Sequence, residues 1–356
     1  MTLTTSAGAP AALAVGAVRS ARRAAASRPR RVLLGLVLAL VGAVLVRTLL
    51  GDYTITAADA VRILVGADGV PRGAEFVLME SKLPRALVGV LAGLALGAGG
   101  ATFQLMARNP LASPDVLGLT MGASAAAVLT LVVLGGSGTA VAVAALLGAA
   151  AVALALILLS GGRTGSTAAA PTRMILVGVA LSAMLTSVVH WVLLRADVYR
   201  AHEAMVWLTG SLAGATWPQI GLLALVVAVA LPLLLATSAQ LHLVELGDDL
   251  AHGVGAPPRP VRARALALVV VLVAATTAVC GPVAFVAFLA GPTARRLLGG
   301  RSSIAASALV GAVVVVLADH LAAYAIPEVN LPVGVVTGLV GAPFLLWLLT
   351  RERSTS

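Results

Sequence analysis

The chain has 356 residues, of which 60% are hydrophobic and 11% are charged, and its formal net charge is +10 at pH 7. This composition excludes a soluble globular domain of this length, because such a domain could not bury so much apolar surface. Helices can hold that surface in a bilayer, since they satisfy their own backbone hydrogen bonds there. The sequence therefore predicts an all-α membrane protein.

Ten apolar stretches approach the roughly 20 residues that a membrane-spanning helix needs. They are Val32–Leu50, Leu83–Met106, Val116–Leu134, Thr139–Leu159, Thr172–Leu194, Pro218–Thr237, Ala263–Val279, Val283–Leu298, Ser303–Ala322 and Leu331–Thr350. The eighth is the least regular, because it is short and contains Gly291-Pro292. We expect one ten-span domain over residues 32–350, between a basic cytosolic segment (1–31) and a short cytosolic tail (351–356).

Basic residues alternate between the loops and give the orientation. With the N-terminus in the cytosol, most arginines fall on the inner side, as the positive-inside rule requires. Merging the seventh and eighth stretches would move Arg295, Arg296 and Arg301 outside, so ten spans fit better than nine. The positive charge thus indicates membrane orientation with both termini cytosolic, rather than nucleic-acid binding.

Some loops contain short patterns of their own. A surface helix is expected around Ala57–Val65 and another over His202–Leu208. After the second span, Asn109-Pro110 ends a helix, and Ser113-Pro114-Asp115 supplies an N-cap, a first-turn proline and a first-turn acid. The residues alone favour a well-formed reverse turn here.

The inner loop Ala239–Arg264 has a different pattern from the spans. Leu243, Leu246, Leu250 and Val254 recur at helical spacing, while Glu245, Asp248, Asp249 and His252 fall on the other side. This predicts a two-sided helix. Its apolar stripe could pack on the bundle itself or dock a cytosolic partner, and the stripe together with the paired acids favours docking.

Several kinds of chemistry are missing from the sequence. There is no G-x-x-x-x-G-K-[ST] loop for ATP, no H-E-x-x-H zinc motif and no G-x-S-x-G nucleophile motif. Ionisable residues inside the spans are scarce, and Asp319-His320 is interpreted as a polar pair at a helix end. We therefore expect no catalytic, cofactor or metal site. An intramembrane enzyme is disfavoured, and so is the main alternative, a secondary transporter driven by an ion gradient.

Seven motifs in order carry a resemblance to a known family. They are Lys82-Leu83-Pro84-Arg85, Arg108–Pro114, Trp207–Leu212, Leu246-Gly247-Asp248, Gly281–Val286, Pro292 with Arg296, and Pro332–Thr337 ending in Gly341–Phe344. In this order and spacing, from about Val32 to Thr350, the chain resembles the FecCD-type permeases of ABC importers for ferric siderophores, haem and cobalamin.

The resemblance implies a set of partners and a cargo. It implies an importer permease in a bacterial plasma membrane, paired with a second, identical or paralogous permease subunit. Two ATPase subunits would bind on the cytosolic side and a substrate-binding protein on the outside. A ferric siderophore is the expected cargo, with haem or cobalamin as alternatives.

The resemblance also implies roles for individual residues. ATPase coupling would fall in a helix over about 245–254, with Leu246, Gly247, Asp248, Asp249, Ala251 and Gly255. Docking of the binding protein would use Lys82 and Arg85, and a cytoplasmic gate would use Asn109, Leu111, Pro171 and Thr172. The chain departs from the family pattern at Lys82 (usually arginine), Thr293 (usually histidine) and Ala323 (usually arginine).

Overall fold

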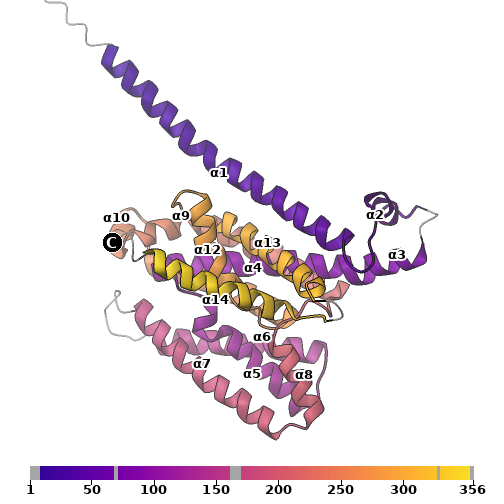
Figure 1. The fold of residues 1–356 in the computed structure, drawn as a ribbon. Coiled ribbons are helices and arrows are strands. Elements are labelled where there is room, and N and C mark those ends of the chain that lie inside the picture. The colour runs from indigo at the N-terminus through magenta and orange to yellow at the C-terminus, as the bar shows by residue number, and fades with distance from the viewer. Residues whose placement is uncertain (1–8, 68–70, 161–169, 327–328, 353–356) are drawn as a thin grey trace, which may run out of the picture.

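The computed structural model describes residues 9–67, 71–160, 170–326 and 329–352. Helices and short turns make up this part of the chain, with no strand in it, which confirms the all-α prediction (Figure 1). The helices are α1 (Ala9–Leu49), α2 (Ala57–Leu64), α3 (Arg72–Phe76), α4 (Leu83–Ala107), α5 (Leu119–Val132), α6 (Thr139–Ser160), α7 (Ala170–Arg195), α8 (Val198–Leu208), α9 (Trp217–Glu245), α10 (Asp248–Gly253), α11 (Pro258–Cys280), α12 (Val286–Leu297), α13 (Ile304–Tyr324) and α14 (Val333–Glu352).

Every one of the ten predicted apolar stretches overlaps a helix. Seven helices in the described residues are long and apolar enough to cross a membrane: α1, the continuous α3–α4 segment, α6, α7, α9, α11 and α13. The other three, α5, α12 and the apolar part of α14, are shorter. At about 1.5 Å per residue, the 12 residues of α12 cover little more than half of a hydrocarbon core about 30 Å thick.

Some boundaries differ from the sequence prediction. A π-helical turn, Val77–Lys82, joins α3 to α4, so this helix begins before the predicted Leu83. The sixth span was expected to end at Thr237, but α9 continues to Glu245 because Leu241 and Val244 are fully buried. The prediction of a single two-sided helix over about 245–254 is therefore wrong in its extent. Gly247, with φ of +134°, separates α9 from the six-residue α10.

Small residues let α4 pack closely at the centre of the molecule. A Cβ atom on Gly93 would lie 2.4 Å from the Cα of Ala312, and one on Gly97 would lie 2.3 Å from the carbonyl oxygen of Ser307. Both of these neighbours lie on α13. Close approach of backbones is how helices attract one another in lipid, where apolar burial gives little advantage. The small residues of α4 therefore allow its close contact with α13.

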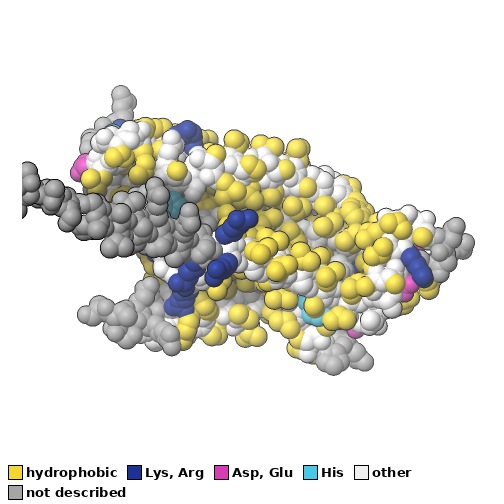
Figure 2. Space-filling view, turned by 90° about the horizontal axis from the view of Figure 1, so that it is seen from above, with side chains coloured by type: hydrophobic (Ala, Val, Ile, Leu, Met, Phe, Trp, Pro, Cys, Tyr) yellow, Lys and Arg dark blue, Asp and Glu magenta, His cyan; other side chains and the backbone are white. Residues whose placement is uncertain are grey.

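Two groups of helices lie on either side of α11. One contains α4, α9, α12 and α13, and contacts α11 through α4 and α9; the other contains α5, α6, α7 and α8, and contacts α11 through α5 and α6. The first helix, α1, packs mainly along α13 and leaves the bundle toward its N-terminal half (Figure 1). Apolar side chains cover most of the face in Figure 2, and most of the basic side chains visible there lie in its left half. An outer surface of this kind fits contact with lipid.

Two ends of the bundle are used below to describe positions. The helices α2, α3 and α8 lie at one end, which we name the α2 end (Figure 1). The short helix α10 lies at the opposite end, which we name the α10 end. The predicted surface helices are confirmed at the α2 end as α2 and α8, although α8 begins earlier than expected, at Val198.

Candidate functional site

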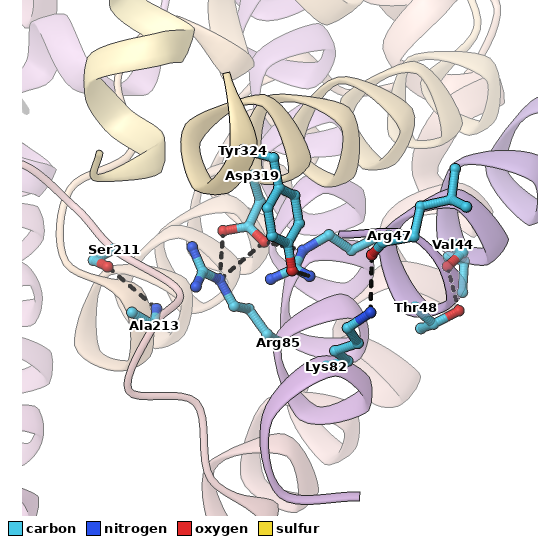
Figure 3. Close-up of polar contacts among 10 residues, drawn as sticks. Val44, Arg47, Thr48, Lys82, Arg85, Ser211, Ala213, Asp319 and Tyr324 are labelled. Atoms are coloured by element: carbon cyan, nitrogen blue, oxygen red, sulfur yellow. Dashed lines mark hydrogen bonds and ion pairs between the residues drawn. The ribbon is translucent and has the colours of Figure 1, made fainter. Parts of the chain in front are cut away.

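At the α2 end, one buried aspartate joins α1 and α4 to α13. The Nε atom of Arg47 donates to Asp319 at 2.6 Å, and the Nε atom of Arg85 donates to both carboxylate oxygens of Asp319 at 2.9 and 3.0 Å (Figure 3). The side chains of Arg47, Asp319 and Arg85 are only 2%, 1% and 12% exposed. Asp319 is therefore part of a buried ion-pair network, and the interpretation of Asp319-His320 as a simple helix-end pair is wrong.

Lys82 lies beside this network and bonds to the turn that follows α1. Its ammonium group donates to the backbone carbonyls of Leu50 at 2.9 Å and Tyr53 at 2.7 Å. The side chain is buried, and its two bonds satisfy carbonyls of the chain that leaves α1. Lys82 and Arg85 therefore lie together at the α2 end, and both make contacts within the chain. Their docking to a binding protein stays a prediction.

Three turns from distant parts of the chain meet in the molecule: the turn after α8, the break between α11 and α12, and the turn before α14. The N–H of Ser211 donates to the carbonyl of Cys280 at 2.8 Å, and the N–H of Gly334 donates to the carbonyl of Gly210 at 3.2 Å. Cβ atoms on Gly210, Gly281 and Gly334 would lie 2.2, 2.5 and 1.9 Å from backbone oxygens of a neighbouring turn. Only glycine allows this contact, which we name the glycine junction.

A cavity of about 480 Å³ adjoins the glycine junction. It is lined by Ser113, Asp115, Thr120, Met121, Leu208, Thr209, Pro282, Val283, Ala284, Phe285, Phe288, Gly334 and Val335. Phe285 has a left-handed backbone, with φ of +64°, where α12 begins. Irregular backbone at membrane depth is tolerated where it is buried in protein or lines a cavity. Four of the motifs noted in the sequence contribute to this one lining.

The turn after α4 forms largely as its residues suggest. The N–H of Leu111 donates to the side-chain oxygen of Asn109 at 2.9 Å, and the N–H of Ala112 donates to the carbonyl of Asn109 at 3.1 Å. Ser113 caps the following segment, but that segment is a short 3-10 turn, Pro114–Leu117, and α5 begins only at Leu119. A second cavity, of about 270 Å³, borders this turn and contains Arg108, Glu245, Arg295 and Arg296 in its lining.

The other two predicted gate residues lie at the start of α7. Pro171 and Thr172 are within its first turn, and their side chains lie outside the described residues. The body of α7 packs against the 3-10 turn after α4, because a Cβ atom on Gly178 would lie 2.7 Å from the Cα of Leu117. The structure thus relates α7 to the segment that follows Asn109 and Leu111, but leaves the four-residue gate a prediction.

The predicted coupling segment has an outward and an inward side. Leu246, Leu250 and Val254 are 68%, 64% and 63% exposed, whereas Ala251 is fully buried against the bundle. The apolar side chains of α10 and its flanks therefore do not pack on the chain's own core. Gly247 and Gly255 have positive φ angles and bound the segment at its two ends.

Asp248 points to the inward side of that segment. Its carboxylate accepts two parallel hydrogen bonds from Arg262, each 2.8 Å long, and a third from Arg108. The hydrogen bonds from Arg262, followed by the charges of Arg262 and Arg108, hold the pKa of Asp248 below its usual value despite partial burial. The neighbouring Asp249 is exposed.

Sequence reasoning missed the ion pairs around Asp319 and those around Asp248 for the same reason. The partners Arg47 and Asp319 are separated by 272 positions, and Arg108 and Asp248 by 140. Spacing along one helix cannot reveal such pairs. We interpreted Asp319 as part of a polar pair at a helix end and Asp248 as part of a docking helix, and neither interpretation included a distant arginine.

Comparison with known proteins agrees with the residues that carry the resemblance. Residues 36–351 match the FecCD transport family. The Fe(3+)-citrate import system permease protein YfmE of Bacillus subtilis is 33% identical over 288 residues, which cover 80% of this chain and 85% of that protein. The Fe(3+) dicitrate transport system permease protein FecD of Escherichia coli is 38% identical over 287 residues, which cover 78% of this chain and 86% of that protein.

A solved structure agrees with the fold. The inward-facing conformation of a metal-chelate type ABC transporter matches with a TM-score of 0.80 and 24% identity, over 90% of this chain and 99% of that one. This likeness supports the arrangement of helices.

Proposed function

Because this chain belongs to the FecCD transport family, we propose that it carries a ferric chelate, most simply a ferric siderophore or ferric citrate, into the cell. The proteins of this family are membrane permease subunits of ABC importers and are not enzymes, since a separate subunit hydrolyses ATP. The cargo is supported by relatives named for Fe(3+)-citrate and Fe(3+) dicitrate transport, at 33% and 38% identity. The family match over residues 36–351 is the observation that carries the proposal.

The geometry suits passive conduction of a bulky cargo. A cavity of about 480 Å³ adjoins the glycine junction, and its lining is mostly apolar, with a few hydroxyl groups and the carboxyl group of Asp115. Such a surface can hold a large chelate weakly, and weak holding is what a conduit needs. Energy would come from the ATPase subunits and cargo selection from a substrate-binding protein.

The α10 end is the proposed cytosolic side. Its exposed leucine pair, Leu246 and Leu250, lies next to the exposed Asp249, which gives the apolar and acidic surface expected for ATPase contact. Residues 1–31 and 351–356 would then also be cytosolic, as the arginine distribution suggests. The gate would close on this side, at the turn with Asn109 and Leu111 and the start of α7.

The α2 end is the proposed outer side, where the binding protein docks. Arg85 uses its Nε atom for Asp319, and its two terminal nitrogens can meet an acidic partner. Lys82 contributes by holding the neighbouring turn in place. A second permease subunit, identical or paralogous, would complete the path.

Uptake by a reconstituted system tests the proposal. The permease, its ATPase and its binding protein are placed in vesicles and offered radioactive ferric citrate, a ferric hydroxamate, haem or cobalamin, with and without ATP. The proposal expects ATP-dependent accumulation of a ferric chelate that an uncoupler does not stop. Uptake that follows an ion gradient and ignores ATP would favour the secondary transporter instead. Accumulation of haem alone or of cobalamin alone would show that this compound, and not a ferric chelate, is the cargo.

A further inference from the structure

Arg108 has an unusual backbone at the end of α4. It is the first residue after the helix and lies in the left-handed region, with φ of +51° and ψ of +33°. A residue other than glycine adopts this conformation at a steric cost. Something in the surrounding structure therefore has to hold Arg108 in place.

The side chain of Arg108 reaches the junction between α9 and α10. Its Nε and Nη2 atoms donate to the carbonyl of Val244 at 3.2 and 2.8 Å. That carbonyl belongs to the last turn of α9, where it also accepts the backbone N–H of Gly247 at 3.3 Å. Nη2 also donates to Oδ1 of Asp248, the first residue of α10. Arg108 thus joins the end of α4 to the start of α10.

The same carboxylate is fixed from a third element. Arg262, in α11, donates through Nη1 to Oδ2 and through Nη2 to Oδ1 of Asp248. This parallel pair of bonds fixes the orientation of the carboxylate as well as its position. The side chains of Asp248 and Arg262 are each 17% exposed, so water screens the pairs only in part. We name Arg108, Asp248 and Arg262 the α10 clamp.

Asp248 and Asp249 are neighbours with different surroundings. Asp249 is exposed and makes no ion pair within the described residues. Asp248 faces the bundle, as does the fully buried Ala251, while Leu246 and Leu250 face outward. The segment can therefore contact a partner on one side and be held by the clamp on the other.

The clamp also lies beside the predicted gate turn. Arg108 is followed directly by Asn109, whose side chain and carbonyl hold the turn through Leu111 and Ala112. The backbone N–H of Asn109 donates to the backbone carbonyl of Gln104, near the end of α4. Hydrogen bonds from Arg108 to Val244 and Asp248 therefore connect the start of α10 to the residue that precedes this turn.

We propose that Asp248 is a positioning residue that makes α10 and the turn after α4 move as one unit. It acts inward, through Arg108 and Arg262, and Asp249 and the exposed leucines act outward on the ATPase. This inference rests on the proposed function, in which an ATPase drives α10. It assigns the two adjacent aspartates to different steps of that coupling.

The first test compares matched variants in the complete transporter. Asp248→Asn keeps the size of the side chain and removes its charge, and Asp249→Asn does the same one residue away. We expect Asp248→Asn to retain the ATPase subunit on purification and to hydrolyse ATP, with uptake per ATP reduced about ten-fold. Asp249→Asn should show the opposite pattern, with weaker ATPase retention and unchanged uptake per bound ATPase.

A double substitution separates the clamp from a general loss of stability. Arg108→Gln should reproduce the Asp248→Asn defect, and the Arg108→Gln/Asp248→Asn variant should be no worse than either single variant. Normal uptake per ATP in Asp248→Asn would overturn the proposal. So would loss of the ATPase subunit from Asp248→Asn to the same extent as from Asp249→Asn.

A second test needs neither cargo nor ATPase. Amide hydrogen exchange is measured on the purified permease, at the N–H groups of Ala251 and Val254, which bond to the carbonyls of Gly247 and Leu250. Asp248→Asn should accelerate exchange there and leave α13 unchanged, whereas Asp249→Asn should change neither. If the wild-type system fails to import ferric chelates but this difference holds, the proposed function fails and the clamp stands. Equal exchange in wild type and Asp248→Asn would contradict the proposal that Asp248 holds α10 in place.

Discussion

The two ends of the molecule contain the same charged group in different surroundings. At the α2 end Asp319 lies between Arg47 and Arg85, and its side chain is 1% exposed. At the α10 end Asp248 lies between Arg108 and Arg262, and its side chain is 17% exposed. Removing one partner of a buried pair leaves an uncompensated charge in a medium of low dielectric, whereas water compensates much of the loss at a partly exposed pair. We therefore expect the α2 end to determine stability and the α10 end to determine coupling.

The largest effect is expected at Asp319. Asp319→Asn leaves Arg47 and Arg85 close together without a counter-charge, and loss of one partner from a buried network costs about 3–5 kcal/mol. Unfolding of the purified protein in detergent, followed by heat or denaturant, measures this loss. Asp248→Asn, measured in the same way, should lose about 1 kcal/mol or less. Equal losses for the two variants would show that burial is not what separates the two ends.

A smaller effect is expected when one arginine of the buried network is replaced. In Arg47→Met the carboxylate of Asp319 keeps its bonds from Arg85, and methionine fills much of the vacated volume. The loss should be about 2 kcal/mol, the range for hydrogen bonds to a charged group. Because α1 packs mainly on α13, hydrogen exchange should rise at the C-terminal end of α1. Unchanged exchange there would mean that apolar packing alone holds this helix.

Capture of the binding protein tests the surface at the α2 end. Arg85→Glu is unsuitable, because it would place a second carboxylate against Asp319. Arg85→Gln avoids this repulsion and should weaken binding-protein capture about ten-fold, with the ATPase still attached. Arg62→Gln, on the exposed face of α2, is the matched control and should bind normally. Undiminished capture by Arg85→Gln would show that Arg85 serves only the ion pair with Asp319 and does not contact the binding protein.

The pH dependence of the α10 clamp follows from the direction of the Asp248 pKa. Because the folded-state pKa is lowered, the stabilisation is complete above the ordinary aspartate pKa of about 3.9 and is lost as pH falls through the still lower folded value. Exchange at α10, corrected for its intrinsic pH dependence, should therefore be constant between about pH 5 and 8. Release of α10 between about pH 5 and 8 would contradict the assignment of the clamp to the Asp248 carboxylate.

The smallest effect is expected at an exposed pair. Arg62 and Asp59 lie 3.7 Å apart on α2, with side chains 60% and 34% exposed. Arg62→Ala should change the free energy of unfolding by less than about 0.5 kcal/mol. A loss comparable to that of Arg47→Met would contradict the ranking by burial.

Local sequence patterns were sufficient to predict most of the fold. Apolar stretches of the right length located the helices, because in lipid every backbone group must bond within its own segment. Turn residues such as Asn109 and Ser113 were assigned correctly because their bonds reach only two or three positions. The end of α9 was missed because buried side chains, Leu241 and Val244, extend the helix beyond the apolar stretch.

The contacts between distant residues could not be predicted in this way. Arg47 and Asp319 resemble ordinary helix-end charges until the fold places them together, and Arg85 gains an internal partner for the same reason. At α10, the sequence located the exposed leucines and the acidic pair but gave Asp248 and Asp249 the same role. Only their three-dimensional surroundings distinguish them.

The glycine junction limits how such a protein can diversify. A methyl group on Gly210, Gly281 or Gly334 would collide with a backbone oxygen of a neighbouring segment. A substitution at any one of them would therefore push apart two segments from different parts of the chain. Side chains that line the adjoining cavity, such as Thr209 and Val335, meet no such restriction. We therefore expect new cargo preferences to arise by substitution of these lining residues, while the three glycines of the glycine junction stay unchanged.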